Sequence, residues 1–402
     1  MRKLRLFLMP YIFSLYKVVF AILKLLPVKN KVVATTMRGR KFSDNPRYII
    51  EALHEIDPNI DIVWFVDERY DYTTPNWVRR VSYYGFGMLK RIYEMATARV
   101  WINSHMFEVF VQKKDSQLFI QTFHGSIIFK KIYQDIKGYN KESESHKEVI
   151  NTSKMTDVFI SNSKYNNALF RRALAYNGTF YQCGFPRNDE LVKPSKDYRT
   201  IVREELGLIG KKIFLYAPTF RKEFEKSHYV DYSVYDIDFQ GVLETLSDCY
   251  DGEWVILVKF HPIMQNYIDE KRYFKHENVK NVTSYVNMQA LLAASDFVLT
   301  DYSSSIFDSA IAGIPGFVVG LDYDRYMEDR DVYFKMEDLP FPFARTNAEL
   351  IANIRDFDSD KYMSKWNLFK KNIGLNETGH AAIDIAKKIK QYLNGEYPVE
   401  WK

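Results

Sequence analysis

Short apolar runs alternate with amphipathic helical patterns along most of the chain, and this alternation constrains the fold more than any other feature. Parallel strands need crossover connections, which helices usually provide, so the pattern predicts parallel sheets covered by helices. The first half contains six predicted strands, at 31–36, 62–65, 99–103, 118–122, 158–161 and 179–183. The second half contains five, at 212–217, 254–259, 279–282, 297–300 and 316–319.

The length of 402 residues favours two domains, because single hydrophobic cores stop growing at about 250–300 residues. We predict an α/β chain in which two Rossmann-like domains face a central cleft, with ligands at the carboxyl ends of the strands. The predicted segments are an N-terminal helix at 1–30, a first domain at 31–205, a second domain at 206–375, and a C-terminal helical segment at 376–402 that packs back on the first domain.

Basic residues are concentrated in the first 31 residues, which contain no Asp or Glu and are otherwise strongly apolar. On a helix, five of these cations fall within an arc of roughly 160°. They are Arg2, Lys3, Arg5, Lys17 and Lys24. This pattern is typical of an amphipathic helix in the membrane interface, and predicts a peripheral protein on the cytoplasmic face of the cell membrane.

Two alternatives for this helix stay open. A spanning helix would bury Lys17 near its middle and be kinked at Pro10, and an ordinary docked helix would pack on the protein. A signal peptide does not fit, because no small-residue cleavage site follows the apolar stretch.

Composition excludes several function classes. Hydrophobic residues make up 47% and charged residues 27% of the chain, which indicates a globular protein. The two cysteines form no disulfide framework and fit a reducing compartment. The net charge of +5 comes with no long basic run, so nucleic acid is not an expected partner. No His, Cys or Asp spacing matches a metal site, and we expect none.

A hydroxyl cluster follows the predicted strand at 297–300. Ser303 and Ser304 stand at the start of a helical pattern, and Asp308 lies four residues after Ser304, on the same helix face. Backbone N–H groups, the helix dipole and the hydroxyls would together form an anion site. The alternative is that one of the serines merely caps the helix.

Histidine ends two of the predicted strands. His124 follows 118–122 and precedes Gly125, where the backbone turns into a loop. A neutral histidine can accept a proton from an attacking hydroxyl, and its ordinary pKa near 6.5 suits that role. A buried structural histidine is the alternative. His105 also follows a strand, but no Gly or Pro turn comes after it, so it ranks lower.

The second such histidine is His261, which follows 254–259 and precedes a proline. Lys259 lies two positions earlier on the same side of the strand, and the pair could hold phosphate oxygens and stabilise a leaving group. Arg187, in a Gly/Pro turn, and the Pro218-Thr219 turn also end strands; both turns could equally be plain turn chemistry.

Taken in order, several motifs resemble the CDP-glycerol glycerophosphotransferase family, whose members build teichoic acid and related capsular polymers. The matching segments are 42–46, 96–103, 121–126 with Lys130, 161–165, 184–189, 216–221, 259–262, 300–308, 322–324 and 330–334. The chain departs from the family pattern at Phe123 (usually Trp), at Ser126-Ile127 (usually Thr-Pro), at Lys259 (commonly Arg) and at 376–380.

This resemblance implies a GT-B fold with an acceptor-binding first domain and a CDP-donor-binding second domain. It implies transfer of glycerol phosphate, or ribitol phosphate, from a CDP-alditol to a hydroxyl of a polyprenyl-linked acceptor, with release of CMP and without a cofactor. His124 would be the base and His261 a second essential residue. Donor contacts would come from Gly125, Ser126, Arg187, Pro218, Thr219, Lys259, Ser303, Ser304 and Asp308.

Two other functions stay open: a GT-B nucleotide-sugar glycosyltransferase, and a membrane-bound polymer-binding scaffold without catalysis. The residues do not distinguish glycerol from ribitol, priming from polymerisation, or teichoic acid from capsule. They leave the oligomeric state undetermined as well.

Overall fold

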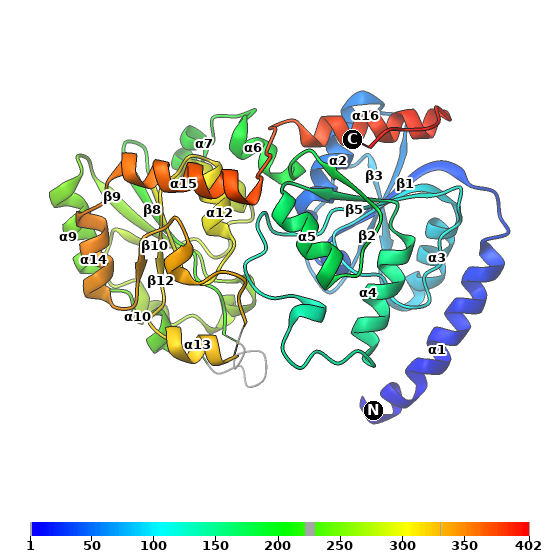
Figure 1. Cartoon of the computed structure of the whole chain (residues 1–402), viewed down its shortest axis with the longest axis horizontal. Coiled ribbons are helices and arrows are strands. Elements are labelled where there is room, and N and C mark those ends of the chain that lie inside the picture. Colours follow the sequence, from blue (N-terminus) through cyan, green and yellow to red (C-terminus); the bar gives the residue numbers. More distant parts are fainter. Residues whose placement is uncertain (1, 222–229, 330, 402) are drawn as a thin grey trace. The chain divides into compact units, whose positions relative to one another are not determined.

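The computed structural model describes residues 2–221, 230–329 and 331–401. The chain forms two compact units (Figure 1). Unit 1 comprises Met1–His124, Ile132–Asp189 and Asn376–Lys402, and unit 2 comprises Gly125–Lys131 and Glu190–Leu375. The chain thus enters unit 2 for the first time immediately after His124.

Unit 1 is built on a seven-stranded sheet in the order β3-β2-β1-β4-β5-β6-β7, and every pairing in it is parallel, as predicted. The strands are β1 (Lys29–Thr35), β2 (Asp61–Val66), β3 (Val78–Ser82), β4 (Ala98–Asn103), β5 (Leu118–Gln121), β6 (Val158–Ser161) and β7 (Thr179–Gln182). The prediction of six strands was wrong by one, since β3 is an edge strand whose exposed Arg79 and Arg80 interrupt its apolar pattern.

Helices cover both faces of this sheet. On one face, α2 (Asp44–Ile56) lies beside α16 (Ala381–Asn394), and their apolar sides pack on Val32 and Ile102 (Figure 1). On the other face, α3 (Met88–Thr97) packs against α1 (Arg2–Leu23). The remaining helices of unit 1 are α4 (Glu144–Met155) and α5 (Lys164–Ala173).

Unit 2 contains a six-stranded parallel sheet in the order β10-β9-β8-β11-β12-β13. The strands are β8 (Lys212–Tyr216), β9 (Trp254–Val258), β10 (Val279–Asn281), β11 (Phe297–Thr300), β12 (Gly316–Val319) and β13 (Phe343–Ala344). Five strands were predicted; β13 has two residues and is too short to leave a pattern.

The helices of unit 2 lie on both faces of its sheet as well. Helices α9 (Phe239–Cys249) and α14 (Asn347–Arg355) cover one face, and α7 (Tyr198–Glu205) and α11 (Met288–Ala294) cover the other. The other helices in the described part of unit 2 are α6 (Asp189–Val192), α10 (Glu270–Tyr273), α12 (Ser305–Ile311), α13 (Tyr323–Asp329) and α15 (Ser359–Ile373). Helix α7 was predicted to end the first domain; its Val202 is instead buried in the core of unit 2.

Both sheets reverse their strand order once, at β1/β4 in unit 1 and at β8/β11 in unit 2. In doubly wound sheets, ligands bind outside the carboxyl ends of the strands at such a reversal. The loops that follow these four strands are therefore where functional side chains are expected.

Helix α1 presents two apolar sides. One side packs on unit 1, where Phe13 and Tyr16 contact Phe110 and the fully buried Phe20 contacts Trp101. The opposite side is a stripe of exposed apolar residues, Tyr11, Leu15, Val18 and Ile22. Lys17 is exposed and Lys24 partly buried, while the side chains of Arg2, Lys3 and Arg5 lie outside the described ones. No helix in the described ranges is long and apolar enough to cross a membrane.

The C-terminal segment that leads back into unit 1 is anchored by Glu377. Its carboxylate accepts hydrogen bonds from the side-chain amides of Asn162 (2.7 Å) and Asn188 (2.8 Å) and from the backbone N–H of Phe185 (2.9 Å). Residues 376–380 depart from the family pattern. Through Glu377 they nevertheless fix the start of α16 to the carboxyl ends of β6 and β7.

Candidate functional site

The predicted site residues divide between the two units. His124 and Arg187 belong to unit 1. The others belong to unit 2, namely Gly125, Ser126, Pro218, Thr219, Lys259, His261, Ser303, Ser304 and Asp308. Each group lies at the carboxyl edge of its own sheet.

His124 is held by the end of β4. Its Nδ1 lies 3.4 Å from the carbonyl oxygen of Ser104, and Nδ1 of His105 lies 3.2 Å from the same oxygen. A carbonyl only accepts, so these contacts place the proton of each neutral ring on Nδ1 and the lone pair on Nε2. The His124 ring stacks with Phe123 and His105, at centroid distances of 4.5 and 4.8 Å. The geometry therefore presents Nε2 of His124 as a base.

Two charged residues, Asp44 and Arg187, act electrostatically on His124. Asp44 begins α2, and Arg187 lies in the short 3₁₀ turn Pro186–Asn188 that follows β7. Arg187 Nη1 is 3.8 Å from Asp44 Oδ1, and both side chains are largely buried. The fully buried Asn45 connects the loops, because its side-chain oxygen accepts the backbone N–H of Arg187 at 3.1 Å.

The environment keeps both histidines neutral. Burial lowers the pKa of His124 below its ordinary value, while the Asp44 carboxylate acts to raise it and Arg187 to lower it. Burial lowers the pKa of His105 to about 3, and the neighbouring His124 and Arg38 act in the same direction because they disfavour a second positive charge. A neutral imidazole is the form that can accept a proton.

In unit 2, the loops after β8 and β11 are joined through Asp301. Its carboxylate accepts the backbone N–H of Thr219 (2.9 Å) and an N–H of Arg221 (2.7 Å). Arg221 also forms a two-point contact with Asp322 at 2.7 and 2.9 Å, and its guanidinium lies over the ring of Tyr302. This buried group of charges shapes the Pro218-Thr219 turn, one side of the reversal point of the sheet.

The serine cluster after β11 is not a simple helix cap. The side chain of Ser304, the residue before α12, makes no capping hydrogen bond. Ser303 Oγ instead accepts the backbone N–H of Ser305 at 3.2 Å. Both serines are partly exposed.

Asp308 and Ser126 lie deeper, where both are buried, and the Ser126 hydroxyl donates to the Asp308 carboxylate. This contact fixes the segment that begins at Gly125, whose φ of +84° favours glycine. Ser126 and Asp308 thus support the loop from within, and their predicted contact with the donor stays a prediction.

His261 has the opposite tautomer to His124. Its Nδ1 accepts the backbone N–H of Ile263 at 3.3 Å, which places the proton of the neutral ring on Nε2. His261 is exposed and contacts Phe220, in the loop after β8. Lys259 donates to the backbone carbonyls of Thr283 (3.2 Å) and Tyr285, so its ammonium holds the loop after β10 as well as carrying charge.

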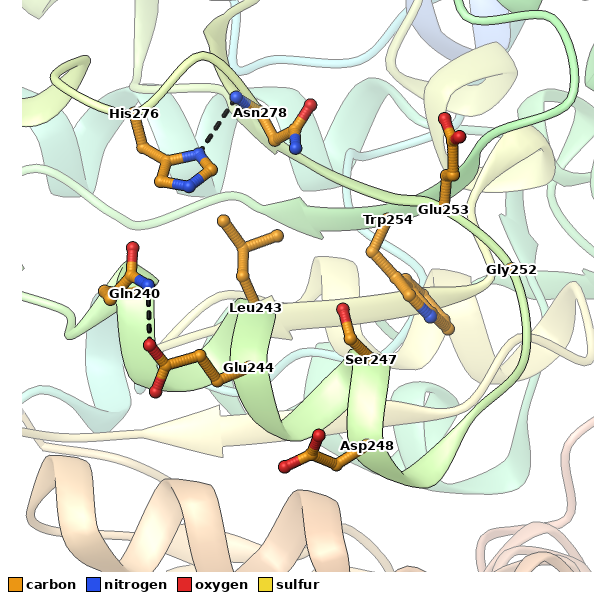
Figure 2. Close-up of a pocket in the computed structure, with 10 residues that line it drawn as sticks. All are labelled: Gln240, Leu243, Glu244, Ser247, Asp248, Gly252, Glu253, Trp254, His276 and Asn278. Carbon is orange, nitrogen blue, oxygen red and sulfur yellow. Dashed lines mark hydrogen bonds between the residues drawn. The ribbon is translucent and has the colours of Figure 1, made fainter.

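One surface pocket lies at the amino edge of the unit 2 sheet, opposite to the carboxyl edge that carries the predicted site residues. It is formed at the amino ends of β9 and β10 and along α9, with Leu243, Trp254 and His276 among its lining residues (Figure 2). None of the predicted site residues lines it. Within the described part of the chain, no group of three or more His, Cys, Asp or Glu side chains could hold a metal ion.

The structure brings three further residues into these groups: Asp44, His105 and Asp301. The sequence analysis ranked His105 below His124, and it included Asp44 and Asp301 in the family-like segments 42–46 and 300–308 without naming them as site residues. Asp44 and His105 follow β1 and β4, the two strands that flank the reversal point, and this order becomes visible only when the sheet is assembled. A polar residue soon after the strand predicted at 31–36 was the available signal for Asp44.

Comparisons with known proteins agree on one family. A model of the family described as CDP-Glycerol:Poly(glycerophosphate) glycerophosphotransferase matches residues 18–391. The teichoic acid poly(glycerol phosphate) polymerase of Bacillus spizizenii is 29% identical over 95% of this chain and 96% of its own length. The teichoic acid glycerol-phosphate transferase of Staphylococcus aureus is 27% identical over 92% of this chain and 95% of its own.

Among solved structures, a variant of the wall teichoic acid polymerase TagF that was soaked with CDPG superimposes with a TM-score of 0.80. It is 25% identical, and the match covers 95% of each chain.

Proposed function

We propose a reaction for this chain from one premise: it belongs to the CDP-glycerol:poly(glycerophosphate) glycerophosphotransferase family, and is therefore a transferase with a TagF-like GT-B fold. The reaction is transfer of glycerol phosphate from CDP-glycerol to a hydroxyl of a polyprenyl-linked acceptor, with release of CMP, in teichoic acid synthesis. Ribitol phosphate is the alternative cargo. The glycerol-phosphate names of the relatives and the CDPG soak of TagF support the glycerol donor.

The observation that carries this proposal is the opposite tautomers of the two strand-end histidines. His124 has its lone pair on Nε2 and can take the proton of the acceptor hydroxyl. The hydroxyl oxygen then attacks the β-phosphorus, the bond from that phosphorus to the CMP oxygen breaks, and CMP leaves with the bonding electrons.

His261 has its proton on Nε2 and can donate a hydrogen bond to the phosphate that departs. Lys259, two residues earlier, adds positive charge, and the hydroxyls of the partly exposed Ser303 and Ser304 donate to phosphate oxygens in this proposal. Transfer by this route needs no metal, because basic groups and hydroxyls carry the charge. We also propose Gly125, Ser126, Arg187, Pro218, Thr219 and Asp308 as donor-site residues, as the family resemblance implies.

We propose further that α1 holds the protein at the cytoplasmic membrane surface, where a polyprenyl-linked acceptor would lie. Exposed apolar stripes of this kind mark interaction sites, and Leu15, Val18 and Ile22 are each more than half exposed. A second exposed apolar pair lies where α3, the helix against which α1 packs, begins: Leu89 in its first turn and Phe86 in the preceding 3₁₀ turn Gly85–Gly87. Both elements belong to unit 1.

The proposal is tested by incubating the purified chain with a short lipid-linked acceptor and, in turn, CDP-glycerol, CDP-ribitol and a UDP-sugar. The expected result is CMP release and a gain of one or more glycerol phosphate masses on the acceptor. Release of UDP with a gain of sugar would support the glycosyltransferase alternative. Binding of acceptor with no nucleotide release from any donor would support the scaffold alternative.

A further inference from the structure

Asp44 combines two unfavourable features that the surrounding structure must enforce. Its φ is +64°, a left-handed conformation that is uncommon for residues other than glycine, asparagine and aspartate. Its Oδ1 is buried and accepts no hydrogen bond in the described part of the chain. A buried unsatisfied acceptor costs about 1–3 kcal/mol. Strained backbone and unsatisfied polar atoms gather at functional sites, so Asp44 calls for a functional explanation.

The neighbouring Asn45 links the start of α2, which carries Asp44, to the residues before the base. The Asn45 amide faces the carbonyl oxygens of Thr122 and Phe123, at 3.4 and 3.5 Å, in the two residues before His124. Its side-chain oxygen accepts the backbone N–H of Arg187. The loops that carry Asp44, His124 and Arg187 are therefore connected through one fully buried side chain, although they come from distant parts of the sequence.

The charged side chains near His124 act on its ring in opposite senses. The Asp44 carboxylate acts on the His124 ring in the sense that favours its protonated form. The Arg187 guanidinium lies 3.8 Å from Oδ1 of Asp44, beyond hydrogen-bond distance, and acts on His124 in the opposite sense. The third ionisable neighbour of His124 is His105, which is neutral.

We propose that Asp44 is a positioning residue for the base: its carboxylate stabilises the positive charge that His124 acquires when Nε2 takes the proton of the acceptor hydroxyl. The inference rests on the proposed function of His124. The proton moves from the acceptor oxygen to Nε2, the oxygen forms its bond to phosphorus, and CMP leaves. His124 then returns the proton to solvent. Asp44 acts through His124 and not on either substrate.

The test replaces Asp44 by asparagine, which tolerates the same left-handed backbone and removes only the charge. We expect kcat to fall about 10- to 100-fold. We also expect the acidic limb of kcat/KM to move to lower pH by about one unit, because the loss of a nearby carboxylate lowers the pKa of His124. ¹⁵N-histidine NMR, with His124 assigned by its substitution, measures the same shift directly. A merely structural role would lower kcat without moving either pKa.

The matched control is Asp61→Asn, which removes a half-exposed carboxylate at the amino end of β2 in the same unit. It should change neither kcat nor the pH limb. If the Asp44→Asn protein fails to fold, Asp44→Gly removes the same charge at a position whose φ glycine accepts, and the same shift is expected.

The outcomes separate this inference from the proposed function. Turnover that survives in His124→Ala overturns the base itself. A His124→Ala protein without turnover, together with an Asp44→Asn protein whose pH limb and His124 pKa match the wild type, overturns the role of Asp44 alone.

Discussion

His105 and His124 direct their Nδ1 atoms to a single acceptor, the carbonyl oxygen of Ser104, and their rings stack at a centroid distance of 4.8 Å. Because one oxygen accepts from both rings, both have the same tautomer. Protonation of either ring would place a charge beside its neighbour, so the pair is stable only with at least one ring neutral.

This pair predicts a loss of stability in acid. The pKa of His105 is about 3 in the folded chain and about 6.5 in the unfolded chain, so between these values the unfolded state binds the extra proton. The contribution of neutral His105 to the free energy of unfolding is complete above pH 6.5. It is lost as the pH falls toward 3, and the loss is about 2 kcal/mol at pH 5. In His105→Phe, urea titrations should show a smaller loss of unfolding free energy between pH 7 and pH 5, by that amount. Equal losses in the two proteins would contradict this account.

Arg221 is predicted to be a structural clamp for the donor turn. Arg221→Lys loses the two-point contact with Asp322, and breaking a buried ion pair costs about 3 kcal/mol. Thermal unfolding should show this loss, and the KM for CDP-glycerol should rise because the Thr219 turn loosens. Arg345→Lys, at an exposed pair with Asp324, is the control and should cost less than about 0.5 kcal/mol. An Arg221→Lys protein with wild-type stability and a normal KM for CDP-glycerol would show that Arg221 does not hold the Thr219 turn in place.

The serine cluster is predicted to bind the donor more than it stabilises the helix. Replacement of both Ser303 and Ser304 by alanine should weaken CDP-glycerol binding at least about 100-fold in calorimetry, since hydrogen bonds to charged groups contribute about 1.5–3 kcal/mol each. The unfolding temperature should change little, because Ser304 makes no capping bond. Ser247→Ala, at the opposite end of the sheet, is the matched control. Unchanged donor affinity would leave the serines with a local structural role only.

Membrane attachment is predicted to depend on the outward stripe of α1. Lysine at both Leu15 and Ile22 should reduce sedimentation with phosphatidylglycerol vesicles at least about tenfold, because each buried side chain contributes roughly 1.5–3 kcal/mol. Turnover with a water-soluble acceptor should be unchanged. Leu368→Lys, at an equally exposed apolar residue in unit 2, should bind vesicles normally. Equal vesicle binding by the double variant and the wild type would exclude this stripe as the anchor.

The sequence predicted the parts of this structure that depend on local pattern. The parallel sheets were expected from alternating strand and helix signals, and strand-end positions drew attention to His124 and His261 before their surroundings were known. The edge strand β3 was missed because Arg79 and Arg80 leave it without an apolar run.

Contacts between distant segments could not be predicted in this way. Ser126 and Asp308 are 182 residues apart, and their hydrogen bond depends on the packing of unit 2. The two tautomers depend on the Ser104 carbonyl and on the Ile263 N–H, which are backbone groups without a sequence signal. The sequence also did not show which apolar residues of α1 are exposed, because an apolar residue gives the same signal whether it packs inward or faces outward.

The central claim is that Nε2 of His124 takes the proton of the acceptor hydroxyl while CMP leaves a CDP-alditol. The most direct measurement compares CMP release by the wild type and His124→Ala in a single turnover with CDP-glycerol and a lipid-linked acceptor. The account predicts that release falls at least about 10²-fold while the Kd for CDP-glycerol stays within about twofold. Release by His124→Ala within a few-fold of the wild type, at equal donor occupancy, would contradict it.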